Sequence, residues 1–482
     1  MRRIAIVGGG ISGLSAAFLL EKRRRQGAAI EYLLFESSSR LGGTVQTENV
    51  DGCLVEAGPD SFLSEKPWAA ELCRELGLGD QLIGSNDAQR KTYILVNQRL
   101  VSIPEGLMFM VPTRLLPILW SPLFSFSAKR RIVQEWFHPP RPAVADESAA
   151  TFVERHYGQE MVERLADPLL AGVYGGEAAN LSLRAVLPRF AEAENKFGSL
   201  GRAMLASRKK GRAAGAATSG AGAPSLFTSL KNGMQQIVDA LVANLPAETL
   251  QTNTPVRELR QVEGVWQLIS DSQAPQRFHS VIVATPAPVA GRLLESTDAR
   301  LAAELKQIAY SSSVTVTLGY AKNALQLPPG FGLLVPRTEG KRMLACTFVH
   351  NKFHHRAPDD RALLRVFLGG SRDEGILAQS EQEILAIVRR ELLEIIGIKS
   401  EPLFARVYKW KAAMAQYAVG HLERLQRIEK LRQGLPGLYL VGNGYRGIGV
   451  PDCIRSGKEA ADQVIGAVTT VATASPSHLV QQ

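Results

Sequence analysis

The stretch RIAIVGGGISGLSAAFLL (residues 3–20) decides the fold of this chain. The apolar run in RIAIV predicts a short strand, three glycines break it, and ISGLSAAFLLEKRRR (11–25) has the apolar spacing of a helix. The basic residues of that helix gather in its last turns, where they interact favourably with the helix dipole. EYLLFE (31–36) predicts a second strand, so these residues form half of a parallel βαβ sheet.

The glycine spacing in the turn is typical of dinucleotide-binding proteins. Gly8, Gly10 and Gly13 form G-x-G-x-x-G directly after a strand and at the start of a helix. The first glycine permits the tight turn, the second lets backbone approach a pyrophosphate, and the third lets the helix pack on the strand. N–H groups of the first helical turn, which includes Ile11 and Ser12, would face the phosphates. A turn with a structural role alone is the alternative.

The segment after the second strand favours FAD over NAD. Glu36 ends that strand 23 residues after the third glycine, where its carboxylate would accept hydrogen bonds from ribose hydroxyls. ESSSRLGGTVQT (36–47) then supplies an R-x-G-G extension, which is typical of FAD-binding chains. VEAGPDSF (55–62) is a further glycine turn that could bring backbone to the isoalloxazine.

A second glycine-rich turn, GNGYRGIGVPDCIRSG (442–457), lies close to the C-terminus. The apolar strand GLYLVG (437–442) precedes it, and its character fits a central position in the first parallel sheet. Pro451 suits the first position of the following helix. We therefore predict that one extended FAD lies between two helix N-termini, the second directed at the flavin pyrimidine edge. A plain strand–helix connection is the alternative.

Composition is that of an ordinary globular protein. The 482 residues are 45% hydrophobic and 21% charged, which allows two or three domains. The net charge is +10, but the basic residues lie in short runs such as EKRRRQ (21–26) without a DNA-binding motif, so we expect no nucleic-acid partner. The four cysteines form no C-x-x-C pair, which argues against a disulfide framework or a metal site and favours a cytoplasmic location.

The most membrane-like stretch is GLMFMVPTRLLPILWSPLFSFSAKRR (106–131). Its prolines and Arg114 interrupt the apolar run, so it cannot form an uninterrupted spanning helix of about 20 residues. We expect short helices that are either buried or rest on a bilayer surface.

Several motifs together resemble one family. They are IVGGGISGLSAAF (6–18), ESSSRLGG (36–43), EAGPDSF (56–62), LLAGVYGGEAANLSLRA (169–185), GFGLLVP (330–336), FLGGSR (367–372) and VGNGYRGIGVPDCIRSG (441–457). The chain resembles the oxygen-dependent protoporphyrinogen/coproporphyrinogen oxidases of haem biosynthesis, within the flavin amine-oxidase superfamily. The likeness covers residue 1 to about residue 465, and AGVYGG and GVPDCIRSG are the motifs most specific to the porphyrinogen branch.

The resemblance implies an α/β (α+β) fold of three interleaved parts. These are a Rossmann-like FAD-binding domain of the GR2 type, a mixed-sheet substrate domain and a helical membrane-associated domain. On the sequence, we expect the FAD-binding domain in residues 1–84, 225–300 and 435–470, the helical domain in 85–206 and the substrate domain in 301–434. The Gly/Ala/Ser-rich residues 207–224 predict a flexible loop, residues 225–245 a single helix, and residues 471–482 a disordered tail.

The family reaction removes six electrons from a porphyrinogen in three two-electron steps, with O2 as the acceptor and H2O2 as the product. Because the hydride goes to flavin N5, we expect no catalytic side chain and no metal; the protein has to hold the reacting carbon beside the flavin. The implied substrate contacts are Thr92, Gly172, Leu334, Thr347 and Phe367. The implied FAD contacts are Gly8, Gly10, Ile11, Ser12, Gly13, Glu36, Ser37, Arg40, Gly42, Gly43, Thr44, Gly58, Pro59, Asp60, Ser61, Val256, Gly442, Asn443, Ile448, Gly449 and Val450.

One position departs from part of the family. Some relatives carry an arginine that pairs with a substrate propionate, and the matching position in QRKTYILVNQRL (89–100) is Thr92. Arg90 and Lys91 are adjacent but would point elsewhere. How the carboxylates are held therefore stays open, as does the choice between protoporphyrinogen IX and coproporphyrinogen III.

Other expected partners are ferrochelatase as the recipient of the product, the cytoplasmic face of a membrane and a second copy of the chain. Two alternatives to a porphyrinogen oxidase remain. One is another enzyme of the superfamily, an amine oxidase or carotenoid desaturase; amine oxidases usually place two aromatics around the flavin, and only Tyr445 is available near the C-terminal turn. The other is a non-catalytic flavin-fold scaffold or haem-handling partner.

Overall fold

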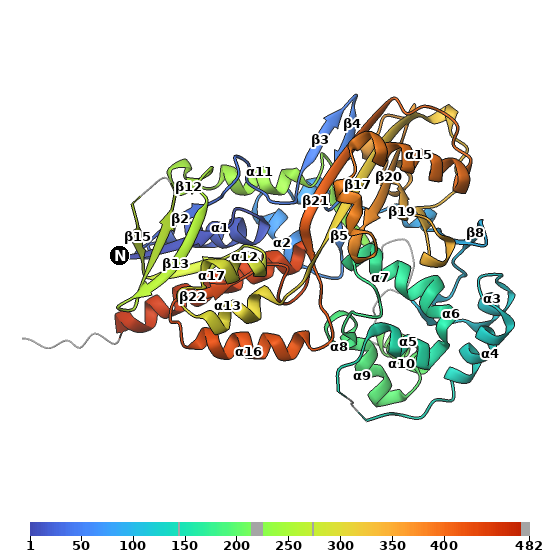
Figure 1. Ribbon diagram of the computed structural model, residues 1–482, viewed down its shortest axis with the longest axis horizontal. Coiled ribbons are helices and arrows are strands. Elements are labelled where there is room, and N and C mark those ends of the chain that lie inside the picture. Colours follow the sequence, from blue (N-terminus) through green and yellow to red (C-terminus); the bar gives the residue numbers. More distant parts are fainter. Residues whose placement is uncertain (143–144, 214–224, 272–273, 474–482) are drawn as a thin grey trace, which may run out of the picture.

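The computed structural model describes residues 1–142, 145–213, 225–271 and 274–473. A five-stranded parallel sheet with the order β12-β2-β1-β16-β22 forms one layer (Figure 1). Its strands are β1 (Arg2–Val7), β2 (Ile30–Phe35), β12 (Leu250–Gln251), β16 (Ser280–Val283) and β22 (Leu438–Leu440). The chain thus returns to its first sheet near the C-terminus, as the sequence predicted.

The last strand lies at the edge of this sheet, so the predicted central position is wrong. β22 is the end strand of the order and pairs with β16. Leu438 is nevertheless fully buried, because it packs with Leu425 and Ile428 of α16 (His421–Gln433). An edge strand that a helix covers needs the same apolar residues as a central strand, and the sequence pattern cannot separate the two.

Different elements cover the two faces of the parallel sheet. Ile4, Ile6 and Ile282 pack against helices α1, α2, α11 and α17. Ala5 and Val7 face the opposite way, toward a three-stranded antiparallel sheet and helices α12, α13 and α16. The bounds are α1 (Ile11–Arg25), α2 (Trp68–Glu75), α11 (Gln235–Ala243), α17 (Val450–Thr473), α12 (Ala287–Leu293), α13 (Ala299–Lys306), β13 (Val256–Val262), β14 (Val265–Ser270) and β15 (Gln276–Phe278).

A second, seven-stranded sheet has the order β21-β17-β20-β19-β18-β7-β8. β18 and β7 pair in parallel and the other neighbours antiparallel, so the sheet is mixed. One face packs against α15 (Glu381–Ile396) through residues such as Val316, Leu364 and Val366. The strands are β7 (Thr92–Val96), β8 (Arg99–Ser102), β17 (Tyr310–Ala321), β18 (Gly332–Leu334), β19 (Met343–Phe348), β20 (Arg361–Gly369) and β21 (Phe404–Ala415).

Strands β7 and β8 come from a segment that we expected to be helical. Tyr93 and Leu95 contribute to the core of the seven-stranded sheet, whereas Ile94 and Val96 contribute to the core of the helical part. Both faces of β7 are therefore apolar. The alternation of polar and apolar residues that marks a half-exposed strand is missing from its sequence.

The helical part has its own core around Ile118, Phe152, Tyr157 and Leu165. Figure 1 shows it below the seven-stranded sheet, at the far end of the molecule from β15. Its longer helices are α3 (Leu115–Trp120), α4 (Phe126–Glu135), α5 (Ala149–Tyr157), α7 (Asp167–Tyr174), α9 (Pro188–Phe197) and α10 (Leu200–Ala213). Over the described ranges, no helix is long and apolar enough to cross a membrane.

Three predictions about the bounds or the type of elements need correction. α10 runs to Ala213, so residues 207–213 are helical, and residues 214–224 lie outside the described residues. Residues 225–245 form a strand and a helix instead of one helix. β11 (Phe227–Leu230) pairs with β5 (Phe62–Leu63) and β6 (Leu82–Gly84), and α11 starts after Gly233, whose φ of +100° turns the chain. α17 reaches Thr473, inside the expected tail, and residues 474–482 lie outside the described residues.

Candidate functional site

The turn between β1 and α1 combines two crowded glycines with an open one. Gly8 has a φ of +111°, and a Cβ atom there would lie 2.7 Å from the carbonyl oxygen of Ala284. A Cβ on Gly13 would lie 1.9 Å from the carbonyl oxygen of Gly8. At Gly10, by contrast, no heavy atom of the described residues lies within 4 Å of the Cβ position. The protein itself requires the first and third glycines, and the space beside the second can admit a ligand.

The N-terminus of α1 suits an anionic ligand. Its N-cap, Gly10, has no side chain that could cap the helix, and the first turn contains no acidic residue. The first N–H groups of a helix have no partner within the helix and carry its positive partial charge. Ile11 and Ser12, which follow the cap, therefore present donors to the open space at Gly10.

Glu36 lies at the end of β2, beside this turn. Its Oε2 accepts a hydrogen bond from the Gly9 amide at 2.8 Å, and its Oε1 accepts from the Ser38 amide at 2.8 Å and the Ser37 hydroxyl at 3.2 Å. The Thr254 amide donates to the Glu36 carbonyl at 2.8 Å. That bond brings the segment before Val256 to the same edge of the sheet.

Arg40 organises the loop that follows. Its guanidinium donates to the carbonyls of Leu41 and Val45, both at 2.9 Å, and to the carbonyl of Gly43. The Gly42 amide donates to the Gly9 carbonyl at 2.8 Å. Burial lowers the pKa of Arg40. The R-x-G-G segment is thereby held against the β1–α1 turn.

Residues 57–61 form the next wall of the site. A Cβ on Gly58 would lie 1.8 Å from the carbonyl oxygen of Thr44, so this segment packs directly on the R-x-G-G loop. Asp60 accepts from Lys352 Nζ at 3.0 Å, and Ser61 Oγ donates to Asp60 at 2.7 Å. Burial alone would raise the pKa of Asp60, but the positive charges of Lys352 and Arg365 outweigh burial and hold the pKa well below its usual range.

The C-terminal turn is fixed by tyrosines from outside its own segment. Tyr310 donates to Asn443 Oδ1 at 3.1 Å. Tyr417 donates to the Asn443 carbonyl at 2.8 Å and accepts from the Gly447 amide at 2.8 Å. Gly442 has a φ of +120°, which favours glycine there.

The helices that follow the two glycine turns pack against each other. A Cβ on Gly457 would be 2.1 Å from the carbonyl oxygen of Ser12, so α17 packs on the first turn of α1. Ile448, Gly449 and Val450 lead into α17, whose first turn carries Asp452 paired with Lys66 at 2.5 Å. Both helices follow strands of the same sheet, β1 and β22.

Four of the five expected substrate residues share one face of the seven-stranded sheet. Thr92 pairs with Gly332, which also pairs with Thr347. Leu334 pairs with Ala345, which also pairs with Phe367. Their sequence neighbours Leu333, Cys346 and Val366 point into the core under α15, so these four side chains point to the opposite face. All four are half-buried.

The fifth residue, Gly172, lies on α7. It is exposed, and the space around its Cβ position is open for 4 Å among the described residues. The end of α7 is tied to the end of β20, because the Ser371 amide donates to the Gly175 carbonyl at 2.8 Å. α7 therefore closes one side of the face that carries Phe367.

Arg90 and Lys91 are the cations next to Thr92 in the sequence. Both are exposed and precede β7, and the Lys91 carbonyl accepts from the Phe331 amide at 2.7 Å. Within the described part of the chain, no group of three His, Cys, Asp or Glu side chains could hold a metal ion.

Comparison with known proteins identifies the family. Residues 11–465 match the family described as flavin-containing amine oxidoreductases. The chain belongs to this family. This flavoprotein is 34% identical to the coproporphyrinogen III oxidase of Bacillus subtilis over 467 residues, covering 96% of this chain and 98% of that protein. It is 27% identical to the protoporphyrinogen oxidase 2 of Arabidopsis thaliana, covering 96% and 94%.

Solved structures agree on the fold. A crystal structure described as a protoporphyrinogen oxidase, from Exiguobacterium sp., superposes with a TM-score of 0.85 at 30% identity, covering 97% of this chain and 99% of that one. The cyclohexylamine oxidase of Brevibacterium oxydans superposes with a TM-score of 0.70 at 18% identity, covering 97% and 99%, and shows the fold alone.

The cofactor of the flavoprotein is FAD, and the geometry fits it. The open space at Gly10, the uncapped start of α1 and the crowded glycines around it form a cradle for a pyrophosphate. Sequence reasoning missed Tyr310, Tyr417 and Arg365, which hold the walls of the site from distant segments. Of these three residues, only Arg365 could have been found from the sequence, because it is a charged residue within the apolar strand LLRVFLGG (363–370).

Proposed function

We propose that this flavoprotein oxidises coproporphyrinogen III to the porphyrin in haem biosynthesis, with O2 as the acceptor and H2O2 as the by-product. The observation that carries the proposal is the sheet face with Leu334, Thr347 and Phe367, which offers half-buried and mostly apolar surface beside α7. Relatives named coproporphyrinogen III oxidase at 29–34% identity support the substrate, whereas the plant relatives named protoporphyrinogen oxidase are 27–28% identical and the Exiguobacterium structure described by that name is 30% identical. A net charge of +10 also favours a substrate with four carboxylates.

FAD, when bound, accepts a hydride from the substrate carbon. The chain then has to hold the macrocycle so that the methylene bridge stays beside the flavin, and orientation of this kind accounts for a large part of many rate accelerations. The Phe367 ring and the Leu334 side chain offer contact area for a flat, apolar ring system. Because loss of hydride from a carbon between two pyrroles leaves a stabilised cation, the mechanism assigns no side chain the role of a strong base.

We infer the cofactor contacts from the same geometry. Residues 8–13 would hold the pyrophosphate, Glu36 the ribose, and the chain from Arg40 to Thr44 would continue toward the flavin. Residues 58–61 and 442–450 would hold the ring, and Val256 would contact the cofactor through its backbone. The bonds that tie Thr254 to Glu36 and Gly42 to Gly9 support this path.

The substrate proposal is tested by the ratio of kcat/KM for coproporphyrinogen III and protoporphyrinogen IX, followed by porphyrin fluorescence. We expect coproporphyrinogen to be favoured by about tenfold or more, because one additional charge-assisted hydrogen bond contributes about 1.5–3 kcal/mol. Cyclohexylamine serves as the control and should leave the flavin oxidised. A protein that forms no porphyrin from either substrate would contradict the proposal.

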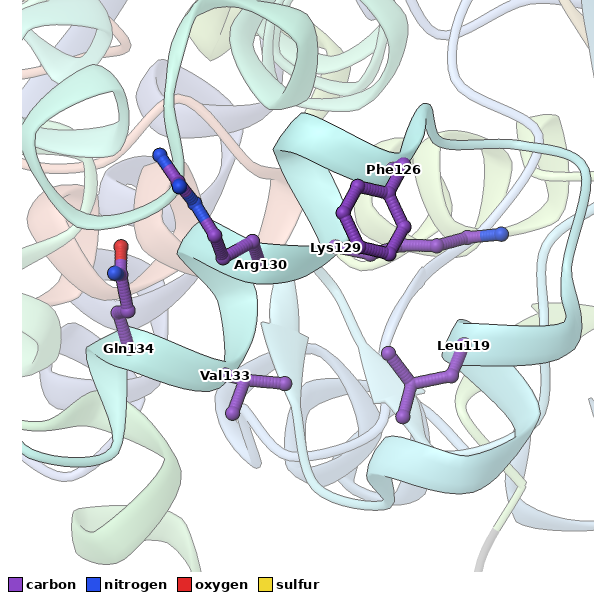
Figure 2. Close-up of a pocket in the computed structure, with 6 residues that line it drawn as sticks. All are labelled: Leu119, Phe126, Lys129, Arg130, Val133 and Gln134. Carbon is purple, nitrogen blue, oxygen red and sulfur yellow. The ribbon is translucent and has the colours of Figure 1, made fainter.

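We also propose a peripheral membrane contact through the apolar patch of α3 and α4, which consists of Leu116, Leu119, Trp120, Phe126 and Val133. Figure 2 shows Leu119, Phe126 and Val133 around a pocket, with Lys129 and Arg130 on the same helix as Phe126. Apolar side chains next to cations are typical of proteins that bind anionic bilayers. Delivery to ferrochelatase, a homodimer and a cytoplasmic location remain predictions.

A further inference from the structure

Four buried charged side chains and one half-buried carboxylate gather at residues 57–61. We call them the loop cluster: Glu56, Lys352, Arg356 and Arg365, which are buried, and Asp60, which is half-buried. Arg356 is fully buried and pairs with Glu56 at 2.9 Å. Lys352 pairs with Asp60 at 3.0 Å, and Arg365 approaches the same carboxylate at 4.0 Å. The three cations come from β20, from α14 (Val349–Lys352) and from the turn after α14.

Arg365 ties the flavin-binding segment to the substrate sheet. It is 5% exposed and donates to the carbonyls of Gly58 and Ala57, the latter at 3.4 Å. Its guanidinium also lies 4.9 Å from the centre of the Phe367 ring. It therefore contacts both Gly58, proposed to lie next to the flavin, and Phe367, proposed to contact the substrate.

The loop cluster carries an excess of positive charge. Three cations against two carboxylates leave one positive charge, and burial raises the pKa of Glu56, which does not reduce the excess. Arg356 Nε and Nη1 and Arg365 Nε have no hydrogen-bond partner among the described residues. A buried charge without a counter-charge is costly, so the cluster favours any state that adds negative charge nearby.

We propose that the loop cluster raises the reduction potential of the bound flavin, with Arg365 as the positioning residue that links the cluster to residues 57–58. Acceptance of a hydride, which is one proton and two electrons, adds one negative charge to the flavin ring. A buried positive excess beside residues 57–61 stabilises that charge more than it stabilises the oxidised ring. The inference rests on the proposed place of residues 58–61 beside the flavin and does not depend on the substrate.

The test is the midpoint potential of the holoenzyme, measured by equilibration with a reference dye and without any porphyrinogen. Arg365→Met should lower the equilibrium constant for two-electron reduction about tenfold, which is ~30 mV for this couple. Arg365→Lys, which keeps the charge, should stay close to the wild type. Asp60→Asn should shift the potential in the opposite direction, because it increases the positive excess.

The opposite signs separate an electrostatic role from damage to the fold, which would not raise the potential in one variant and lower it in the other. Arg361→Gln is the matched control, since Arg361 lies on the same strand and pairs with the exposed Asp360. The proposal is overturned if Arg365→Met and Asp60→Asn keep the wild-type potential or both shift it in the same direction. If Arg365→Met is purified without flavin, Asp60→Asn decides alone, and an unchanged or lowered potential overturns the proposal. A failure to oxidise porphyrinogens would leave these potentials unaffected.

Discussion

At Gly10, a substitution can weaken FAD binding without disturbing the packing of the protein itself. Its backbone has a φ of −72° and a ψ of 178°, which alanine adopts readily. No heavy atom of the described residues would touch an added Cβ. The added methyl group would therefore meet the cofactor and not the protein.

We predict that Gly10→Ala raises the Kd for FAD by about tenfold or more, equivalent to about 1.4 kcal/mol. The free energy of unfolding of the apoprotein should stay unchanged or rise by about 0.4–1 kcal/mol, because alanine restricts the unfolded chain. FAD titration by fluorescence and urea unfolding measure the two quantities. Gly375→Ala is the control, since its Cβ would make only an ordinary contact at 3.8 Å with Asp373; equal FAD affinity in the two variants would contradict the prediction.

Single residues of the site were predictable where a motif carries a steric rule. Gly8 and Gly13 follow from such a rule, because a strand, a tight turn and a helix must meet within a few residues. Tyr417 was not predictable, since its bonds to Asn443 and Gly447 span 26 and 30 residues of chain and depend on where the chain leaves β21. Such contacts are set by tertiary packing, which no local pattern records.

At the scale of elements, His156 connects three helices of the helical part. Its ring nitrogens lie 3.2 Å from Glu135 of α4 and 3.2 Å from Glu194 of α9. Arg155 also pairs with Glu194, and the His138 ring lies 5.4 Å from the His156 ring. His156 is 2% exposed, so water does not screen these pairs.

The pH dependence of this network has a defined sign. Burial alone would lower the pKa of His156, but its bonds to Glu135 and Glu194 outweigh burial and raise the pKa. Folding therefore gains most from His156 below about pH 6.5, and the gain is lost as pH rises through the folded-state pKa. Burial would raise the pKa of Glu194, but His156 and Arg155 lower it, so its contribution is lost in acid.

We predict that His156→Gln lowers the free energy of unfolding by about 3–5 kcal/mol near pH 6, as expected when one partner of a buried ion pair is removed. The difference from the wild type should shrink steadily between about pH 6.5 and pH 9, measured by urea unfolding. His355→Gln serves as the control because that histidine is exposed. A difference that grows with pH would contradict the assignment.

Elements were predictable from sequence where one face is apolar and the other polar. α15 follows this rule, as its buried Ile384, Val388 and Leu392 recur at helical spacing. β7 does not, because one of its faces belongs to the core under α15 and the other to the core of the helical part. The segment that became β11 and α11 failed for a different reason, since the turn at Gly233 interrupts a pattern that looks continuous.

At the scale of the whole molecule, the apolar patch lies on the outer helices of the helical part, remote from the five-stranded sheet (Figure 1). Trp120 is 87% exposed and Phe126 85% exposed. Together with their neighbours they form a contiguous apolar patch, and such patches mark sites of interaction with proteins or membranes. α4 also presents Lys129 and Arg130 next to Phe126, while Ile132 and Glu135 turn into the core. The helix is thus anchored from behind while its outer side offers apolar and basic groups together.

We predict that the protein binds vesicles of phosphatidylcholine containing phosphatidylglycerol and binds vesicles of phosphatidylcholine alone only weakly. Each basic residue near an anionic surface contributes about 1 kcal/mol, and the aromatic rings add burial of apolar area, so the affinity should fall as salt is raised. Trp120→Ser combined with Phe126→Ser should reduce binding in a sedimentation assay by about tenfold or more. Leu403→Ser combined with Val419→Ser, which changes exposed apolar residues outside the patch, should not. A wild-type protein that stays in the supernatant with anionic vesicles at low salt would rule out the membrane contact and leave the patch to a partner of another kind.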